Sequence, residues 1–296
     1  MYYYSPLRYP GGKNKAITLF REVVKVNKMK GCVYVEPFAG GASVAIGLLI
    51  EGDANRIIIN DADPSIYSFW FSCINNIEEF CLRLNETAVN IDEWQRQKDT
   101  YRQLRQIALR GDDYDIMQLG FATFYLNRAN RSGILKGGMI GGRSQTGKYG
   151  INARFNKPEL EVRLRNVASM ADRIEIHCED AKSFIENNVE LWPDNTLIYC
   201  DPPYVQKGRG LYMNYFKRED HLALSETIKG IKDKKWVVTY DMDPLIEELY
   251  HDYLNKKLTL SYSASHKHST SKSDEYIFFS PNLIVPDDEK LAPLDL

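Results

Sequence analysis

The alternation of apolar and polar positions predicts strands and helices that follow one another at both ends of the chain. Short apolar runs that are rich in β-branched and aromatic residues and end in turn or acidic residues are typical of buried strands. Seven runs have this pattern: Cys32–Glu36, Arg56–Asn60, Arg173–His177, Thr196–Cys200, Trp236–Tyr240, Lys257–Ser261 and Glu275–Phe279. Helical spacing is found at Ser43–Glu51, Ala181–Val189, Asp220–Ile231 and Pro244–Tyr250. The pattern predicts an α/β fold with one doubly wound, seven-stranded mixed sheet, in which the last two strands form a candidate hairpin.

The middle of the chain has a different pattern. More than a hundred residues separate the second and third predicted strands, which is too long for a loop inside a compact domain. Ile77–Arg110 and Asp115–Arg131 have the apolar spacing of helices, and Ser132–Asn156 contains seven glycines. We therefore expect an inserted, mainly helical subdomain that ends in a hairpin or a mobile loop. The predicted domains are 1–66 and 166–285 for the two parts of the sheet domain, 67–165 for the insertion, and 286–296 for a loosely packed tail.

Composition limits the classes of protein and of partner. The 296 residues are 44% hydrophobic and 26% charged, as in soluble globular proteins, which argues against disorder and coiled coil. Lys and Arg number 38 against 40 Asp and Glu, so a nucleic-acid site requires a local basic patch. Five cysteines without a CxxC pair favour reduced core thiols, and we expect no metal. The apolar stretch Ala42–Ile50 is too short to span a bilayer and no secretory signal is visible, so we expect a cytoplasmic protein without a membrane role.

The strongest chemical signal follows the predicted strand Thr196–Cys200. Asp201-Pro202-Pro203-Tyr204 places a carboxylate, a rigid kink and an aromatic ring at the carboxyl end of a buried strand, where open α/β sheets bind ligands. The prolines lack N–H groups, so the local carbonyl groups are acceptors beside the carboxylate. Such acceptors suit an amino group like adenine N6, whose lone pair they help to localise for attack, and Tyr204 can stack on the base. A proline-rich turn without a ligand is the alternative.

A second signal lies after the first predicted strand. Val33–Ser43 runs from a strand through small residues into a helix, which is the geometry of a nucleotide-type cofactor loop. Asp61, about twenty residues further on, can accept hydrogen bonds from both hydroxyls of a cofactor ribose, or it can cap the helix that begins near Pro64. Asp63 competes for that capping role. Ser5–Lys13 pairs a glycine turn with a lysine; it is either a surface turn or part of a site, and it lacks the glycine spacing of a phosphate loop.

Together these segments resemble the Dam-type DNA adenine-N6 methyltransferases of class α, or D12 class, which use S-adenosylmethionine. The family order is an aromatic-x-Gly-Gly-Lys segment, a Glu-Pro-Phe-x-Gly loop, a target-recognition insertion and Asp-Pro-Pro-Tyr, and this chain has all four in that order over nearly its whole length. The resemblance implies a Rossmann-like methyltransferase fold, the cofactor S-adenosylmethionine with its product S-adenosylhomocysteine, and an inserted DNA-recognition subdomain. The departures are Ala42, where glycine is commoner, and Tyr9-Pro10, where tryptophan and a small residue are frequent.

The resemblance also implies roles for individual residues. Asp201, Pro202 and Tyr204 are the implied catalytic residues, with Asp201 and the Pro202 carbonyl holding N6. The implied cofactor residues lie along the same motifs: Tyr9, Lys13, Asp61 and Asp201 line the cofactor, Glu36, Phe38 and Gly40 belong to the loop under its methionine part, and Asp180 lies near its adenine end. Phe124–Arg128, followed by Arg131-Ser132-Gly133, resembles the start of the family's DNA-contacting region.

Charge supports a DNA site independently of the resemblance. Arg128–Arg165 carries nine basic residues against two acidic ones, a net charge of +7 in a chain of −2. Its glycines let the backbone approach a groove, and its side chains offer donors to phosphates or base edges. The candidate DNA-binding residues are Asn127, Arg128, Arg131, Ser132, Lys136, Arg143, Gln145 and Lys148. The alternative is that this stretch is only a solvated face.

These observations leave three hypotheses. The leading one is a site-specific enzyme that flips an adenine out of double-stranded DNA, stacks it on Tyr204 and methylates N6 directly, with no obligate protein partner. The second is cytosine-N4 methylation, because the same amine chemistry applies, although serine often replaces the first Asp in those relatives. The third is a cofactor-responsive DNA-binding module without turnover, against which the intact Asp201 and Tyr204 argue.

Overall fold

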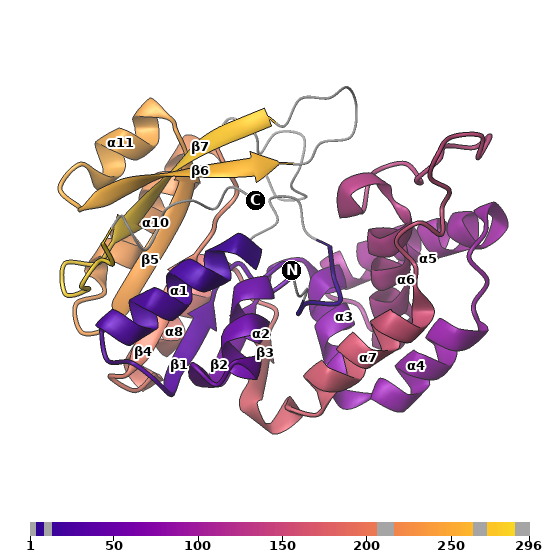
Figure 1. Ribbon diagram of the computed structural model, residues 1–296, viewed down its shortest axis with the longest axis horizontal. Helices are drawn as coiled ribbons and strands as arrows, with labels where there is room; N and C mark the ends of the chain where they lie inside the picture. Colours follow the sequence, from indigo (N-terminus) through magenta and orange to yellow (C-terminus); the bar gives the residue numbers. More distant parts are fainter. Residues whose placement is uncertain (1–3, 9–13, 206–215, 263–270, 288–296) are drawn as a thin grey trace. The chain divides into compact units, whose positions relative to one another are not determined.

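The structure is a computed structural model that describes residues 4–8, 14–205, 216–262 and 271–287 (Figure 1). The chain divides into two compact units. The helical unit comprises Met1–Pro10 and Asp63–Cys178, and the sheet unit comprises Gly11–Ala62 and Glu179–Leu296. The first boundary lies close to the predicted one at residue 66, and the second lies after the predicted one at residue 165.

Among the described residues, seven strands form one sheet in the order β3-β2-β1-β4-β5-β7-β6. β1 pairs in parallel with β2 and β4, and β4 pairs in parallel with β5, whereas β7 is antiparallel to both β5 and β6. The predicted mixed sheet and the antiparallel pairing of its last two strands are confirmed. The strands are β1 (Cys32–Glu36), β2 (Ala54–Asn60), β3 (Ile174–His177), β4 (Thr196–Cys200), β5 (Lys235–Asp241), β6 (Asn255–Tyr262) and β7 (Ser271–Phe279).

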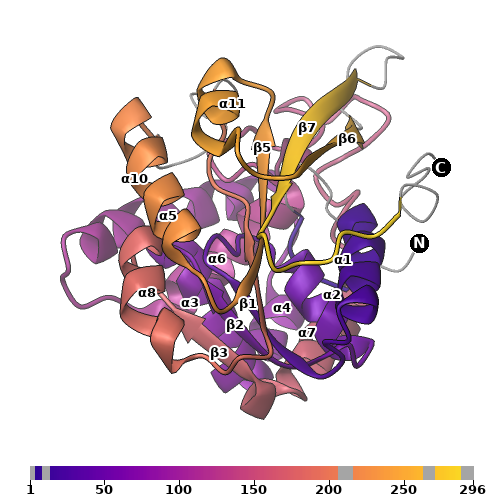
Figure 2. The ribbon, with the colours of Figure 1, turned by 90° about the vertical axis from the view of Figure 1, so that its left-hand side faces the viewer.

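Helices of the sheet unit cover both faces of the sheet (Figures 1 and 2). One face is covered by α1 (Asn14–Val26) and α2 (Ser43–Ile50). The opposite face is covered by α8 (Ala181–Asn188), α10 (Arg218–Gly230) and α11 (Pro244–Tyr250). This three-layer arrangement is the Rossmann-like α/β architecture that the sequence predicts.

Strand alternation builds a separate core on each face of the sheet. On the α1 face, the Phe20 ring contacts Tyr34 and Tyr199, with centroids 5.8 and 4.5 Å apart. On the other face, intervening residues such as Ile198 and Cys200 join the apolar cluster that includes side chains of α8, α10 and α11. The sequence analysis missed α1, although its buried apolar residues recur at helical spacing.

The described residues of the helical unit are mainly helical. Its helices are α3 (Pro64–Asn75), α4 (Ile77–Glu86), α5 (Ile91–Leu109), α6 (Ile116–Ala129) and α7 (Lys157–Ala168). Aromatic rings fill the space between them: Phe124 of α6 stacks on Phe69 at 5.8 Å and meets Phe80 edge-on at 5.4 Å. Such offset and edge contacts are favourable beyond the area that they bury.

The segment between α6 and α7 forms turns rather than a hairpin. A single isolated antiparallel bridge joins Asn130 to Met139 in the described part of this segment. Further along, the Gln145 amide donates to Ile140 O at 2.9 Å and accepts from Ile151 N at 2.8 Å. One side chain, and not a strand ladder, therefore closes this loop.

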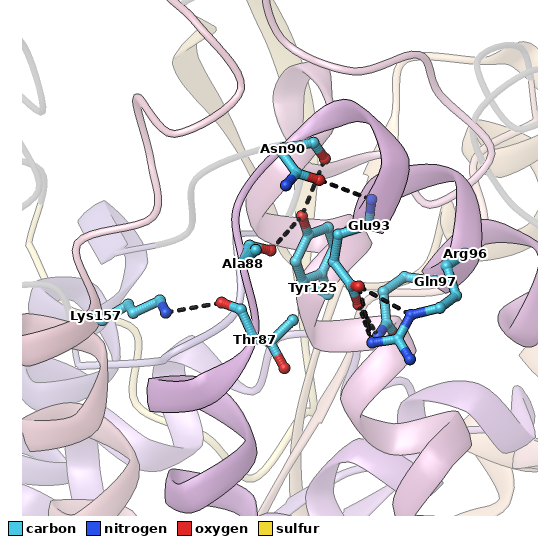
Figure 3. Close-up of polar contacts among 8 residues, drawn as sticks. All are labelled: Thr87, Ala88, Asn90, Glu93, Arg96, Gln97, Tyr125 and Lys157. Carbon is cyan, nitrogen blue, oxygen red and sulfur yellow. Dashed lines mark hydrogen bonds and ion pairs between the residues drawn. The ribbon is translucent and has the colours of Figure 1, made fainter.

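A buried phenol closes the turn between α4 and α5 (Figure 3). The Tyr125 hydroxyl donates to the backbone carbonyls of Ala88 and Asn90, at 3.1 and 3.4 Å. Burial is the main cause of the raised pKa of Tyr125, so the hydroxyl keeps the proton that it donates. The Asn90 side chain caps α5, and Lys157 donates to Thr87 O at 2.7 Å, just after α4. This lysine of the basic stretch is therefore used by the fold.

At Gly120, helix propensity and packing predict opposite effects of an alanine substitution on the free energy of unfolding. A Cβ atom at Gly120 of α6 would lie 2.4 Å from Ser68 O of α3. Alanine normally stabilises a helix by about 1 kcal/mol relative to glycine, but here it would force the two helices apart. We expect Gly120→Ala to lower the free energy of unfolding by about 1 to 3 kcal/mol, measured by urea denaturation.

Gly138→Ala is the control for this experiment, because a Cβ atom there meets nothing within 4 Å. The control should change the free energy of unfolding by less than about 0.5 kcal/mol. A Gly120→Ala protein as stable as the parent would contradict the close approach of α3 and α6.

Candidate active site

Two of the predicted motifs begin on neighbouring strands at the carboxyl edge of the sheet. β1 and β4 are parallel neighbours, with Val35 beside Ile198. From this pair the sheet order runs outward in opposite directions, through β2 to β3 on one side and to β5 on the other. Ligands of open α/β sheets bind beyond the carboxyl ends of the strands, where the strand order reverses. The loops after Glu36 and Cys200 both begin at this point.

The Asp201–Tyr204 motif starts directly after β4. Asp201 is half-buried, whereas both prolines are buried. Tyr204 is only 6% exposed, and its ring belongs to the apolar cluster on the α8, α10 and α11 face. The motif is therefore anchored in the core on one face of the sheet, while stacking of a base on Tyr204 stays a prediction.

Two buried polar residues of β5 hold this motif at both ends. Thr239 donates its hydroxyl hydrogen to Asp201 Oδ1 at 2.8 Å. Asp241 Oδ1 accepts from the backbone N–H of Val205, the residue after Tyr204, at 3.1 Å. Neither residue was predicted from the sequence. The available signal was polar positions near the carboxyl end of an otherwise apolar strand.

The loop after β1 and the carboxylate after β2 are directly connected. Gly40 N–H donates to Asp61 Oδ2 at 2.8 Å, so the structure brings together two predicted cofactor positions. Gly40 and Ala42 both have left-handed backbones, with φ of 45° and 44°. The left-handed conformation costs a residue with a Cβ atom about 1 to 2 kcal/mol, so glycine is the favoured residue at the position of Ala42.

The alternative role for Asp61, capping the helix at Pro64, belongs to Asp63. Asp63 is the N-cap of α3 and accepts from Ser65 N at 2.9 Å. Its carboxylate also pairs with the buried Arg105 guanidinium of α5 at 3.1 Å. Asp63 thus serves the helical unit, and Asp61 the glycine loop of the sheet unit.

Glu36, the last residue of β1, is buried and bound to the start of α2. Its Oε1 accepts from Ala45 N in the first turn of this helix at 3.0 Å. A carboxylate is favourable there because the first N–H groups of a helix have no partner within the helix. Burial and, next, the negative charge of Glu36 raise the pKa of Tyr34. The predicted contact of Glu36 with a cofactor stays a prediction.

Asn60, the last residue of β2, links the loop after β1 to the segment before α8. Its buried Nδ2 donates to Pro37 O and Glu179 O, both at 3.0 Å. Its Oδ1 accepts from Glu179 N at 2.9 Å. The amide therefore ties two segments of the candidate cofactor site to the sheet. Asn60 was not predicted as a site residue, although it adjoins Asp61 at the end of a predicted strand.

The other predicted cofactor residues are less constrained. Asp180 is exposed and caps α8, accepting from Ser183 N at 3.0 Å. Phe38 is half-buried, and its ring centroid lies 6.1 Å from that of Phe216. Tyr9 and Lys13 lie outside the described residues.

Two predicted DNA-binding residues are buried in the helical unit. The Asn127 amide accepts from Arg8 N at 2.7 Å and donates to Arg8 O at 2.6 Å. The Arg128 guanidinium is 8% exposed and donates to Arg154 O at 2.8 Å and Pro6 O at 3.4 Å. Burial, and then the charge of Arg8, lower the pKa of Arg128 to about 9. Both side chains hold chain segments against the end of α6 and do not reach the surface.

The remaining candidates differ in how far their side chains are exposed. Gln145 is half-buried, and its amide closes the loop described above. The exposed candidates all lie between α6 and α7: Arg131, Ser132, Lys136, Arg143 and Lys148. This segment is the part of the basic stretch whose donors can meet a polyanion.

The described residues offer neither a cluster of metal ligands nor a membrane-spanning helix. No group of three or more His, Cys, Asp or Glu side chains is placed there to hold a metal ion. None of the helices in the described ranges is long and apolar enough to cross a membrane.

Comparison with known proteins agrees with the motifs. The model of the D12 class N6 adenine-specific DNA methyltransferases matches residues 9–264. The chain is 22% identical to the Type II methyltransferase M.MjaIII of Methanocaldococcus jannaschii, covering 85% of this chain and 89% of that protein. It is also 22% identical to the Retron Ec67 DNA adenine methylase of Escherichia coli, covering 90% and 88%. A SAM-dependent methyltransferase structure from Agrobacterium tumefaciens aligns at 9% identity with a TM-score of 0.42, covering 90% of this chain and 62% of that one.

Asn60 provides a prediction about the stability of the site. Asn60→Ala removes the three hydrogen bonds that the buried Asn60 side chain makes with the backbone of Pro37 and Glu179. We expect the free energy of unfolding to fall by about 3 kcal/mol, measured by urea denaturation. Asn188→Ala is the control, because this side chain makes one hydrogen bond, to Phe184 O at 2.8 Å, and its loss should cost about 1 kcal/mol or less. Equal losses would show that Asn60 does not link these segments.

Proposed function

Because this chain belongs to the D12 class N6 adenine-specific DNA methyltransferases, we propose that it methylates one short sequence in double-stranded DNA after rotating the target adenine out of the helix. It is a methyltransferase enzyme whose methyl donor is S-adenosylmethionine and whose substrate is DNA. One observation carries the proposal: Asp201–Tyr204 begins at the carboxyl end of β4, beside the strand that leads into the Glu36–Gly40 loop. The amine-binding motif and the candidate cofactor loop thus begin on neighbouring strands.

The role of the protein's own residues is to bind adenine N6 so that its lone pair is available for attack on the methyl group. The lone pair of adenine N6 is delocalised into the ring, which makes the free base a poor nucleophile. The Asp201 carboxylate and the Pro202 carbonyl are assigned as acceptors for the two N6 hydrogens. Thr239 supports this role, because it holds one oxygen of the carboxylate in a defined position. No covalent enzyme intermediate is required.

Tyr204 is assigned to stack on the rotated base. Removing a base from the duplex costs a few kcal/mol, and aromatic stacking contributes about 1 to 3 kcal/mol per base. The backbone after Tyr204 is held by buried Asp241, so the ring has a fixed anchor. A fixed ring loses little further freedom when a base binds.

The residues at the carboxyl edge fit S-adenosylmethionine. A half-buried carboxylate at Asp61, bonded to a glycine loop, suits the hydroxyls of a ribose, and the half-buried Phe38 ring suits an apolar contact. Glu36, Gly40 and Asp180 are assigned to the same site. Tyr9, Lys13 and Asp201 are assigned to it from the family motifs. When bound, the cofactor supplies an electrophilic methyl group.

DNA contacts are assigned to the exposed part of the basic stretch. Arg131, Ser132, Lys136, Arg143 and Lys148 have exposed side chains between α6 and α7. Asn127, Arg128 and Gln145 are left out of this assignment, because their polar atoms bind other parts of the helical unit. The family match favours adenine over the cytosine-N4 alternative.

The first test of this function is the loss of the Asp201 carboxylate. Asp201→Ala should lower the rate of methyl transfer from labelled S-adenosylmethionine to unmethylated DNA by about 100-fold or more, since N6 loses an acceptor. Asp194→Ala, a change at the opposite end of β4 with a 99% exposed side chain, should keep the parent rate. An Asp201→Ala protein with more than a few per cent of the parent rate would refute the assigned role.

Single-molecule sequencing tests the modified base and its context. Genomic DNA from a methylation-free host that expresses this chain should contain N6-methyladenine in one sequence context.

The second test concerns the exposed cations. Lys136→Ala, Arg143→Ala and Lys148→Ala should each weaken DNA binding and flatten the dependence of log affinity on log salt by about 0.9, because each phosphate contact releases a counterion. Arg110→Ala is the control, since this exposed arginine lies outside the stretch and pairs with Asp112. Unchanged affinity and salt slope in all three variants would place DNA recognition elsewhere in the chain.

A further inference from the structure

Three side chains form a chain of hydrogen bonds behind the Asp-Pro-Pro-Tyr motif. Tyr199 Oη lies 3.0 Å from Thr239 Oγ1, and Thr239 Oγ1 lies 2.8 Å from Asp201 Oδ1. Tyr199 and Thr239 are 4% and 3% exposed. The series therefore runs from the interior of the sheet to the half-buried carboxylate.

The strand register brings these residues together. β4 and β5 are parallel, with Tyr199 beside Val237 and Cys200 beside Val238. Continuing this register by one residue places Asp201 beside Thr239, on the same face of the sheet as Tyr199. The contact is thus set by the same pairing that orders the sheet.

Chemistry fixes the direction of the hydrogen bonds. An ionised carboxylate has no proton to donate, so Thr239 gives its one hydroxyl hydrogen to Asp201. In the contact between Tyr199 and Thr239, the phenol is then the donor. Burial, and next the negative charge of Asp201, raise the pKa of Tyr199, so the phenol keeps its proton. Hydrogen bonds arranged head to tail in this way polarise one another.

We propose that Thr239 is a positioning residue for methyl transfer and that Tyr199 acts through Thr239. The inference rests on the proposed role of Asp201 as an acceptor for N6. A carboxylate can rotate about its Cβ–Cγ bond, and a donor on Oδ1 fixes the plane in which its oxygens lie. An acceptor that is already oriented needs no rearrangement when the amine arrives.

A neutral hydrogen-bond donor is suited to orienting the Asp201 carboxylate. The acids whose charges also raise the pKa of Tyr199 are Glu275 of β7 and Glu36 of β1. A hydroxyl donor orients Asp201 without adding a positive charge, so the negative charge of the carboxylate stays in place. That charge is what attracts the N6 hydrogens.

Valine and serine separate the two parts of the threonine side chain. Thr239→Val keeps the shape and removes the donor, whereas Thr239→Ser keeps the donor and removes a methyl group. Under single-turnover conditions with saturating enzyme, we expect Thr239→Val to lower the methyl-transfer rate about 10- to 100-fold. Thr239→Ser should stay within about 3-fold of the parent rate, because it keeps the donor on Asp201. Dissociation constants for S-adenosylmethionine and DNA should change by less than about 3-fold in both variants, because the proposal affects orientation and not binding.

Thr196→Val is the matched control. Thr196 is buried at the other end of β4, and its hydroxyl donates to Pro193 O at 2.6 Å. This variant loses a buried threonine hydrogen bond, so its free energy of unfolding should fall as that of Thr239→Val does. Its methyl-transfer rate should equal that of the parent. The comparison separates loss of stability from loss of positioning.

A double-mutant cycle tests the role of Tyr199. Tyr199→Phe alone should slow methyl transfer, by less than Thr239→Val does. Added to Thr239→Val, it should slow the reaction no further, because Tyr199 acts through the hydroxyl that valine lacks. A second, additive loss would overturn the indirect role of Tyr199.

The outcomes distinguish this inference from the proposed function. Retained activity in Asp201→Ala refutes the role of Asp201 itself. An inactive Asp201→Ala together with the parent rate in Thr239→Val overturns only the positioning role. Equal slowing by valine and serine would also overturn it, because serine keeps the hydroxyl donor that valine lacks.

Discussion

The candidate site depends on the parallel pairing of β1 with β4. These strands are adjacent in space but far apart in the sequence, with Val35 beside Ile198. Parallel strands end at the same edge of the sheet. The Glu36–Gly40 loop and the Asp201–Tyr204 motif therefore begin next to each other. Slipping the register by one residue would turn Tyr199 and Asp201 to the opposite face. The apolar cores on both faces of the sheet therefore fix where the chemistry occurs.

Buried polar side chains at the carboxyl ends of the strands fix the loops that follow these strands. Asn60 ends β2 and binds backbone on both sides of it, while Thr239 and Asp241 at the end of β5 hold the Asp201–Tyr204 motif. A buried polar group without a hydrogen-bond partner destabilises the folded state, so each of these side chains is compatible with few arrangements of its neighbours. The loops are therefore ordered by side chains that lie outside the four family motifs.

This division explains what the sequence could predict. The strands were predictable because burial on both faces leaves continuous apolar runs, and Asp201 stood out because two prolines follow it. Thr239 was missed because threonine is common in strands, and its partner lies 38 residues away. Asn127 was misleading, because the backbone that its amide binds, at Arg8, lies 119 residues away. Local pattern identifies elements and motifs, but the partners of buried polar groups depend on the tertiary fold.

The basic stretch shows the same limit for charge. Its net charge of +7 includes cations that the helical unit itself uses. These are Arg128 in the interior, Lys157 on the backbone carbonyls of Asn85 and Thr87, Arg163 with Glu159, and Arg165 with Glu78 and Glu161. The exposed cations are Arg131, Lys136, Arg143, Lys148 and Arg154, and no acidic residue lies between the first and the last of them. A duplex that met all five would give a salt slope of about 4 to 5, well below what nine cations imply. Within this stretch, the positive charge on exposed side chains is thus smaller than the total, and it lies in the glycine-rich segment between α6 and α7.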